Sequence, residues 1–222
     1  VVVAIAILFS SLPEIKPSEA NAEAAGDSAS SGKQSVFQFP HLWLGVLCLF
    51  VYVGVEVLAG DAIGTYGNGF GLPLDHTKYF TAFTLGAMLL GYVVGLITIP
   101  RFVSQERYLS ISAVLGVVFA IAAYFTKGYV SVGFVAALGF ANAMMWPAIF
   151  PLAIKGLGRF TETGSALLVM GIAGGAIIPQ LFAVLKQHHD FQLVFVALAV
   201  PCYLYILFFA RYGHRFGKAP QA

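Results

Sequence analysis

Six long apolar stretches limit what this chain can fold into. They occupy residues 42–66, 79–100, 108–126, 129–154, 164–185 and 191–210. Each is close to the 20 or so apolar residues that an α-helix needs to cross the hydrocarbon core of a bilayer. Over the whole chain 59% of residues are hydrophobic and 10% are charged, whereas soluble proteins average about 25% charged residues. The sequence therefore predicts an all-α integral membrane protein whose surroundings are the lipid bilayer, and it excludes a cytosolic enzyme domain.

The charged and sulfur-containing residues exclude several other classes. The 12 Lys and Arg residues give a net charge of only +2, too few and too scattered to follow a nucleic-acid backbone, so no nucleic acid is expected as a partner. Cys48 and Cys202 lie inside apolar runs without ligand-like neighbours, so we expect neither a disulfide nor a zinc site. No phosphate-binding or metalloprotease motif is present. We therefore expect no cofactor, no metal and no enzymatic activity.

The chain divides into four parts by composition. Residues 1–12 are apolar but too short to cross a bilayer, and they lack the basic n-region of a signal peptide, so we interpret them as the end of a truncated transmembrane helix. Residues 13–39 are rich in Pro, Glu, Ala, Ser and Asp, which predicts a cytoplasmic central linker. Residues 40–215 hold the six-helix transmembrane bundle, and residues 216–222 form a tail.

The basic residues predict the orientation. If the linker is cytoplasmic, only Lys78, Lys127 and Lys186 of the 12 basic residues fall on the opposite side. This asymmetry follows the positive-inside rule, so the C-terminus is expected in the cytoplasm and the protein in a bacterial inner membrane. A truncated helix, a linker and six helices with both ends inside match the second half of a twelve-helix carrier. Such a carrier binds its solute between two six-helix halves, so the N-terminal half is an expected partner.

The first complete helix carries two carboxylates, Glu56 and Asp61. A charge at the bilayer centre costs roughly 2.5 to 3.5 kcal/mol, so each carboxylate must face protein or water. Tyr52, Glu56 and Gly60 share one face, whereas Asp61 lies about 140° from Glu56 on an ideal helix. Both acids can line one cavity only if it is broad or if the backbone loosens at Gly60. Alternatively, they bond within the bundle, or Asp61 is simply solvated near the interface.

The fourth helix places Asn142 and Trp146 on one face, directly before Pro147 and Pro151. The prolines predict a bent helix, and bends of this kind often line a solute path. An amide beside an indole suits the polar edge and the apolar face of a sugar ring. The alternative is that Asn142 bonds across helices and Trp146 fills core space. We expect Glu56, Asn142 and Trp146 to face one shared cavity.

Glycines and loop charges have simpler interpretations. The fifth helix carries a stripe of small residues, Gly171, Gly174 and Gly175. This stripe predicts close packing against a neighbouring helix, and the alternative is that the missing side chains leave room for a ligand. Gly91 and Gly95 form a comparable face on the second helix, with Tyr92 between them. Charges in the short loops around residues 101–107 and 155–162 are interpreted as topology signals, with a gate-like ion-pair network as the alternative.

Three motifs resemble one known family. They are YVGVE at 52–56, NAMMWPAIFPLAI at 142–154, and GSALLVMGIAGGAIIP at 164–179. Together they resemble the C-terminal half of the fucose, galactose and glucose proton symporters, a branch of the major facilitator superfamily. The resemblance covers roughly residues 40–215 and implies hexose uptake driven by a cation gradient through alternating access. It places Tyr92 where relatives of the fucose carrier have Arg, and Asp61 where they commonly have an uncharged residue.

The functional prediction is therefore secondary active transport of a hexose with a coupling cation, H⁺ or Na⁺. Glu56 and Asn142 are expected to bond sugar hydroxyls, Trp146 to contact the ring, and Asp61 to assist binding or ion coupling. Tyr52, on the same face as Glu56, is also expected among the substrate-binding residues. The family's main proton-coupling acids lie in the other half. Two alternatives stay open: a carrier of a non-sugar solute such as a nucleoside or drug, and a membrane scaffold or membrane enzyme.

Overall fold

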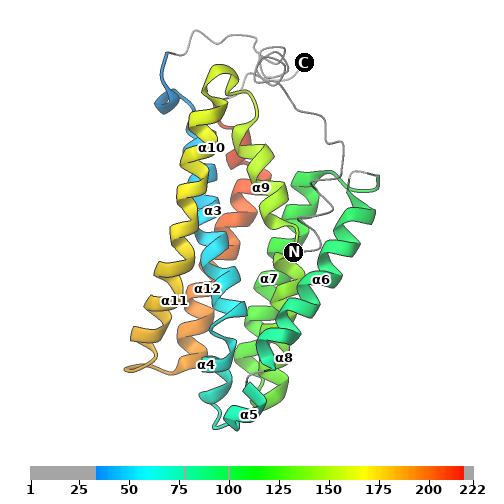
Figure 1. The fold of residues 1–222 in the computed structure, drawn as a ribbon, viewed down its shortest axis with the longest axis vertical. Helices are drawn as coiled ribbons and strands as arrows, with labels where there is room; N and C mark the ends of the chain where they lie inside the picture. The colour runs from blue at the N-terminus through cyan, green and yellow to red at the C-terminus, as the bar shows by residue number, and fades with distance from the viewer. Residues whose placement is uncertain (1–33, 78, 100, 218–222) are drawn as a thin grey trace, which may run out of the picture.

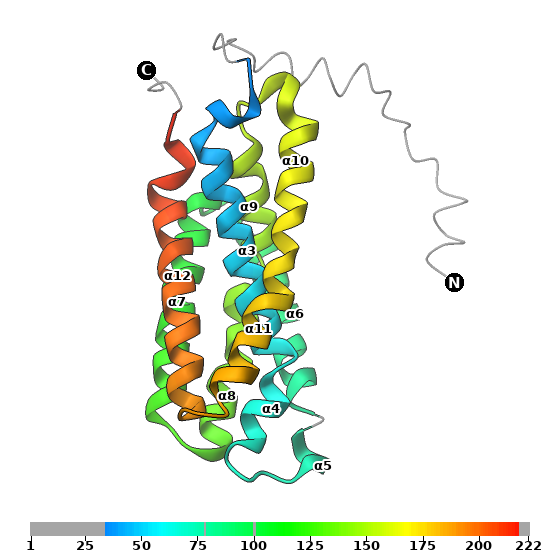
Figure 2. The same cartoon turned by 90° about the vertical axis from the view of Figure 1, so that its left-hand side faces the viewer.

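A computed structural model describes residues 34–77, 79–99 and 101–217, and within these ranges the chain is entirely helical. Six helical segments are long and apolar enough to cross a membrane. Figures 1 and 2 show them running up and down as one elongated bundle. The segments are Pro40–Gly60, Phe80–Thr98, Gln105–Phe125, Gly128–Ile154, Gly158–Leu185 and Phe191–Arg215. The predicted fold class and the six predicted spans are confirmed.

Helix α3 (Pro40–Gly60) lies at the centre of the bundle and contacts most of the others. Pro40 is its first residue. Proline is favoured at this position because it has no backbone N–H, and the N–H groups of the first helical turn have no partner within the helix. The helix ends at Gly60 and a turn at Asp61 and Ala62 leads into α4 (Ile63–Asn68). The sequence analysis treats 42–66 as one continuous stretch and names a loosened backbone at Gly60 only as one condition for a shared cavity, whereas the structure has a turn directly after Gly60.

The helices that follow α4 pack around the central α3 or against one another. The short α5 (Leu74–Thr77) precedes α6 (Phe80–Thr98), and α7 (Gln105–Phe125) returns beside α12. Helix α12 (Phe191–Arg211) closes the bundle and ends in the 3-10 turn η4 (Gly213–Arg215).

Two of the spans are interrupted in mid-course. The fourth consists of α8 (Gly128–Asn142) and α9 (Met145–Ile154), separated by a turn at 143–144. This interruption agrees with the bend predicted at Pro147, whose missing N–H cannot bond the carbonyl of Ala143, whereas α9 continues through Pro151. The fifth follows the 3-10 turn η2 (Gly158–Phe160) and consists of α10 (Thr161–Met170), the 3-10 turn η3 (Gly171–Ala173) and α11 (Gly174–Leu185), which continues past Pro179.

The glycine stripe on the fifth span has the packing role that the sequence predicts. A Cβ atom on Gly174 would overlap the backbone carbonyl of Phe50 on α3, and one on Gly171 would lie 3.1 Å from the carbonyl oxygen of Val46. On α6, a Cβ on Gly91 would meet the carbonyl oxygen of Phe140 at 2.6 Å. Only glycine allows these helix backbones to approach so closely.

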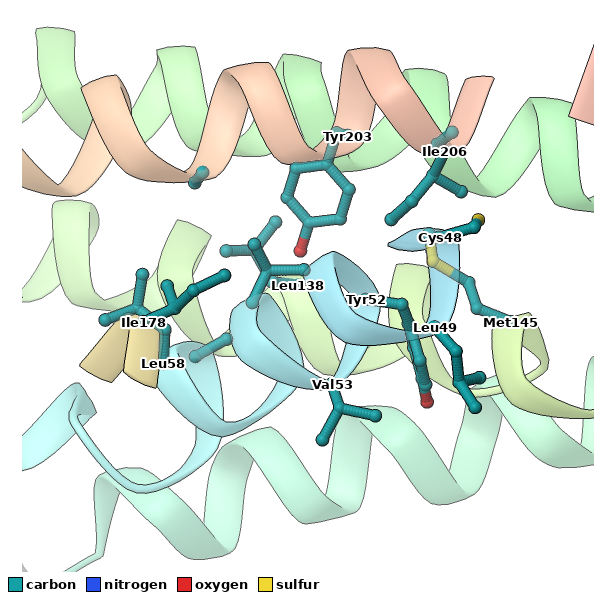
Figure 3. Close-up of a cluster of buried hydrophobic side chains, with 14 of the residues drawn as sticks. Cys48, Leu49, Tyr52, Val53, Leu58, Leu138, Met145, Ile178, Tyr203 and Ile206 are labelled. Atoms are coloured by element: carbon teal, nitrogen blue, oxygen red, sulfur yellow. The ribbon is translucent and has the colours of Figure 1, made fainter. Parts of the chain in front are cut away.

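Figure 3 shows the apolar core around α3. Side chains of α3 pack against Leu138 of α8, Met145 of α9 and Ile178 of α11, while Tyr203 reaches from α12 toward α3. Cys48 and Cys202 are both free thiols, and Cys48 is buried. In contrast, α6 is mostly exposed on its outer face, where Leu89 and Leu96 are 66% and 72% exposed.

The predicted segments at the two ends fall largely outside the described residues, namely the truncated helix at 1–12, most of the linker at 13–39 and most of the tail at 216–222. Within the linker, Val36–Gln38 form the 3-10 turn η1, capped by the side chain of Ser35. Phe39, directly after it, is buried against the bundle.

Candidate functional site

Glu56 is held in place by Tyr52 on the same face of α3. The Tyr52 hydroxyl donates a hydrogen bond of 2.7 Å to Oε1 of Glu56. Tyr52 itself is buried among the core side chains, whereas Glu56 is half-buried. Within the described residues, Oε2 of Glu56 has no hydrogen-bond partner. The carboxylate therefore has one oxygen fixed by the protein and one oxygen available to a ligand.

Trp146 lies beside this pair, on the first turn of α9. Its ring meets the ring of Tyr52 edge to face, with centroids 6.5 Å apart and an interplanar angle of 68°. The half-buried indole N–H makes no hydrogen bond to any described residue. We call Tyr52, Glu56 and Trp146 the Glu56 cluster. It offers a carboxylate acceptor, an indole donor and an aromatic surface at the break between α8 and α9.

Asn142 occupies the last residue of α8, just before the break, and differs from these three because it is completely buried. Its Oδ1 accepts a 2.9 Å hydrogen bond from the hydroxyl of Tyr203 on α12. Its Nδ2 is buried without a partner in the described structure. Asn142 is thus bonded to α12 through Tyr203, and its side chain does not itself reach open space.

Asp61 lies apart from the cluster. It sits on the exposed turn that ends α3, where its backbone N–H bonds the carbonyl of Val57. Tyr92 of α6, the position that the family resemblance pairs with an Arg, is half-buried.

A second polar group, which the sequence analysis does not single out, lies at the end of the bundle where α12 begins. Nε2 of Gln192 donates hydrogen bonds of 2.9 Å to the carbonyl oxygens of Ala123 and Thr126, at the C-terminal end of α7. The hydroxyls of Tyr66 and Ser131 are 2.7 Å apart beside it, and the Ser131 hydroxyl bonds the Ala123 carbonyl. We call Gln192, Tyr66 and Ser131 the Gln192 network.

Tyr52 and Glu56, which the sequence analysis places on one face of α3, are thus joined by a direct hydrogen bond. Tyr203 and Gln192 are functional or structural partners that the sequence alone leaves unmarked. Both lie on α12, where polar side chains are few and stand apart from one another within an otherwise apolar sequence, and that sparsity is the one signal that could have identified them. Within the described residues, no group of His, Cys, Asp and Glu side chains could hold a metal ion.

Solved structures show the class of protein that this fold defines. The chain superimposes on a crystal structure of a major facilitator superfamily transporter, FucP, in the outward conformation, with a TM-score of 0.77, 22% identity and 96% of the chain covered. A structure of the fucose:proton symporter FucP of Escherichia coli gives a TM-score of 0.78 at 24% identity. The chain covers 51% and 52% of these proteins. The fold is therefore that of the second half of a major facilitator transporter.

Sequence relatives give the closer relationship. The chain is 31% identical over 184 residues to a glucose/galactose transporter of Brucella abortus. The aligned region covers 82% of the chain and 44% of the relative. It is 25% identical over 215 residues to the L-fucose-proton symporter of Escherichia coli, covering 95% of the chain and 48% of the relative. The chain thus spans about half the length of the curated relatives it matches, and no protein-family model matches it. These homologues confirm the resemblance to the fucose, galactose and glucose symporters.

Proposed function

We propose that this chain is the second half of a carrier that moves a hexose across a bacterial inner membrane by alternating access, with its C-terminus in the cytoplasm. One observation carries the proposal, namely the half-buried Glu56 with one oxygen bonded by Tyr52 and the other unpartnered in the described structure. A carboxylate in a membrane span is costly unless it has a function or a partner. Here Tyr52 satisfies only part of its bonding capacity.

The proposed sugar contacts follow from the Glu56 cluster. Oε2 of Glu56 accepts a hydrogen bond from a sugar hydroxyl, and the indole of Trp146 supplies a donor and an apolar face for the ring. Asn142 contributes its unpartnered Nδ2 when the break between α8 and α9 opens. Leaving such a buried donor unpaired costs about 1 to 3 kcal/mol, which favours any state in which Nδ2 gains a hydroxyl partner. Asp61 modulates the cluster through its charge rather than by contact.

The remaining walls of the site belong to the N-terminal six-helix half, which faces the exposed sides of this bundle. The relatives named as sugar transporters and as a proton symporter support a hexose as solute and a proton as coupling ion. Sodium is the alternative ion. By itself this half lacks one wall of the cavity, so residues 1–222 expressed alone should give no sugar accumulation.

The test is hexose uptake by the full-length carrier in cells that lack their own hexose transport. Glu56→Gln removes the acceptor charge, and we expect it to lower uptake by more than tenfold at unchanged membrane insertion, because hydrogen bonds to charged groups contribute about 1.5 to 3 kcal/mol. Glu162→Gln, an exposed acid at the start of α10, is the matched control. Unchanged uptake in Glu56→Gln would contradict the proposal.

Two further measurements decide the solute and the ion. Competition of labelled glucose uptake by a panel of sugars, nucleosides and drugs separates a hexose carrier from a carrier of another solute. Uptake into proteoliposomes under an imposed pH gradient or an imposed sodium gradient identifies the coupling ion. Stimulation by neither gradient would contradict cation coupling.

A further inference from the structure

The end of the bundle where α12 terminates contains a basic cavity that the transport proposal does not use. It lies between the first turns of α7 and the last turn of α12 and has a volume of about 450 Å³. The guanidinium groups of Arg107, Arg211 and Arg215 line it, together with one carboxylate, Glu106. Three cationic side chains against one acidic side chain give this cavity a positive charge.

The arginines are available to a ligand. In the part of the chain that the structure describes, no ion pair or hydrogen bond engages the guanidinium of Arg107 or Arg211. Arg215 is oriented by its neighbour, because its Nε donates a 3.2 Å hydrogen bond to Nε2 of His214. Nδ1 of His214 lies 3.0 Å from the carbonyl oxygen of Phe209, a contact that helps to position the ring. The bond from Nε leaves the two terminal nitrogens of Arg215 without a partner in the described residues.

A second cavity, of about 680 Å³, lies on the other side of the last turns of α12 and is apolar. Trp43 and Leu47 of α3 line it together with Phe37, Phe208 and Phe216. The ring of Phe208 lies 6.4 Å from that of Tyr212, which borders the basic cavity, and 6.2 Å from that of Phe216. A row of aromatic rings therefore connects the two cavities across α12.

We propose that these two cavities form a binding site for an anionic phospholipid. The lipid phosphate lies between Arg107, Arg211 and Arg215, and an acyl chain lies along Trp43, Phe208 and Phe216. Guanidinium groups match phosphate oxygens by paired hydrogen bonds, and cations at the end of a membrane span attract anionic lipid headgroups. A free phosphate ion would use only the basic cavity, whereas an amphiphile uses both.

Arginines at the end of a span also act as topology signals, for which only the charge matters and not the position. The two roles can be separated by moving a charge without removing it. In the double variant Gln105→Arg/Arg107→Gln the loop keeps its charge while one guanidinium leaves the basic cavity. Only lipid binding should respond to this change.

The experiment uses the full-length carrier in nanodiscs, with Trp43 as the only tryptophan and all others, Trp146 included, replaced by phenylalanine. Brominated acyl chains quench tryptophan fluorescence on contact. We expect brominated phosphatidylglycerol to quench Trp43 more strongly than brominated phosphatidylcholine at equal bromine content. We call the difference between the two lipids the excess quenching, and we measure the phosphatidylglycerol concentration that gives half of it. This concentration should rise on the order of tenfold in Arg107→Gln/Arg211→Gln. It should also rise in the double variant Gln105→Arg/Arg107→Gln.

Arg101→Gln removes an exposed arginine from the same loop but not from the basic cavity, and it should leave the excess quenching unchanged. Retention of phosphatidylglycerol in native mass spectra provides a second measurement on the same variants. Equal quenching by the two lipids, or an equal loss in Arg101→Gln, would overturn the proposal. Abolition of the excess quenching by inorganic phosphate at the lipid's concentration would also overturn it, because the site would then take a soluble anion.

Discussion

The two polar groups of this bundle differ in how completely the protein satisfies them. In the Gln192 network, the carboxamide of Gln192 bonds two backbone carbonyls at the end of α7, and the hydroxyls of Tyr66 and Ser131 bond each other. In the Glu56 cluster, the described protein bonds only one carboxylate oxygen and leaves the indole N–H of Trp146 unpaired. A satisfied network stabilises the fold, whereas unused hydrogen-bonding capacity on a half-buried surface is what a solute needs. On the proposed function, we therefore expect the Gln192 network to contribute to stability and the Glu56 cluster to contribute to binding.

The largest effect is expected from Gln192→Leu. It removes the donor that satisfies the carbonyls of Ala123 and Thr126, so the free energy of unfolding should fall by about 1 to 3 kcal/mol. Thermal unfolding of the purified full-length carrier, followed by size-exclusion chromatography, measures the loss. Gln180→Leu is the control, because Gln180 is exposed on α11. Sugar affinity measured below the unfolding temperature should not change, and a selective loss of affinity would reverse the assignment.

Tyr52→Phe should have the next largest effect, and on a different quantity. It removes the bond that orients Glu56, so we expect sugar affinity to fall about tenfold, in line with a hydrogen bond to a charged group. Scintillation proximity binding of labelled hexose measures the change. If the melting temperature falls while the sugar affinity is unchanged, Tyr52 stabilises the core and does not contribute to sugar binding.

A smaller effect is expected from Trp146→Phe. Phenylalanine keeps an aromatic surface beside Tyr52 but lacks the indole N–H, so the cost should be that of one neutral hydrogen bond, about 1 kcal/mol or fivefold in affinity. The same binding measurement applies. Wild-type affinity in this variant would show that the indole N–H makes no contact with the sugar.

The smallest effect is expected from Tyr92→Phe. Tyr92 is half-buried on α6, and no hydrogen bond joins its hydroxyl to the described residues. Sugar affinity should therefore change less than Tyr52→Phe changes it, and stability should stay the same. A loss as large as that in Tyr52→Phe would place the hydroxyl of Tyr92 in the site.

The sequence predicts the fold well because apolar length and proline position act locally. The six spans and the interruption before Pro147 follow from such local signals, whereas the turn after Gly60 lies inside a stretch that the sequence analysis leaves continuous. The bond between Tyr52 and Glu56 is predictable for the same reason, since residues four apart on a helix share a face.

The contacts between helices could not be predicted in this way. Asn142 and Trp146 lie on one face by spacing, but the break between α8 and α9 separates their surroundings. Asn142 turns to Tyr203, which lies far along the chain, and Trp146 turns to Tyr52. Gln192 likewise finds its partners on α7 only after the bundle has assembled. Such pairings depend on how helices rotate against each other, and one sequence carries no periodic signal for that rotation.

The contact between the fifth span and α3 bears on how the carrier can move. At Gly171 and Gly174 these helices meet backbone to backbone, so no side chain lies between them that could change rotamer and let them slide apart. The two helices should keep their spacing throughout a transport cycle. On the proposed function, we expect the rearrangement that admits or releases solute to be concentrated at the turns at 61–62 and 143–144, which follow Glu56 and Asn142 along the chain and are suitable positions for distance probes.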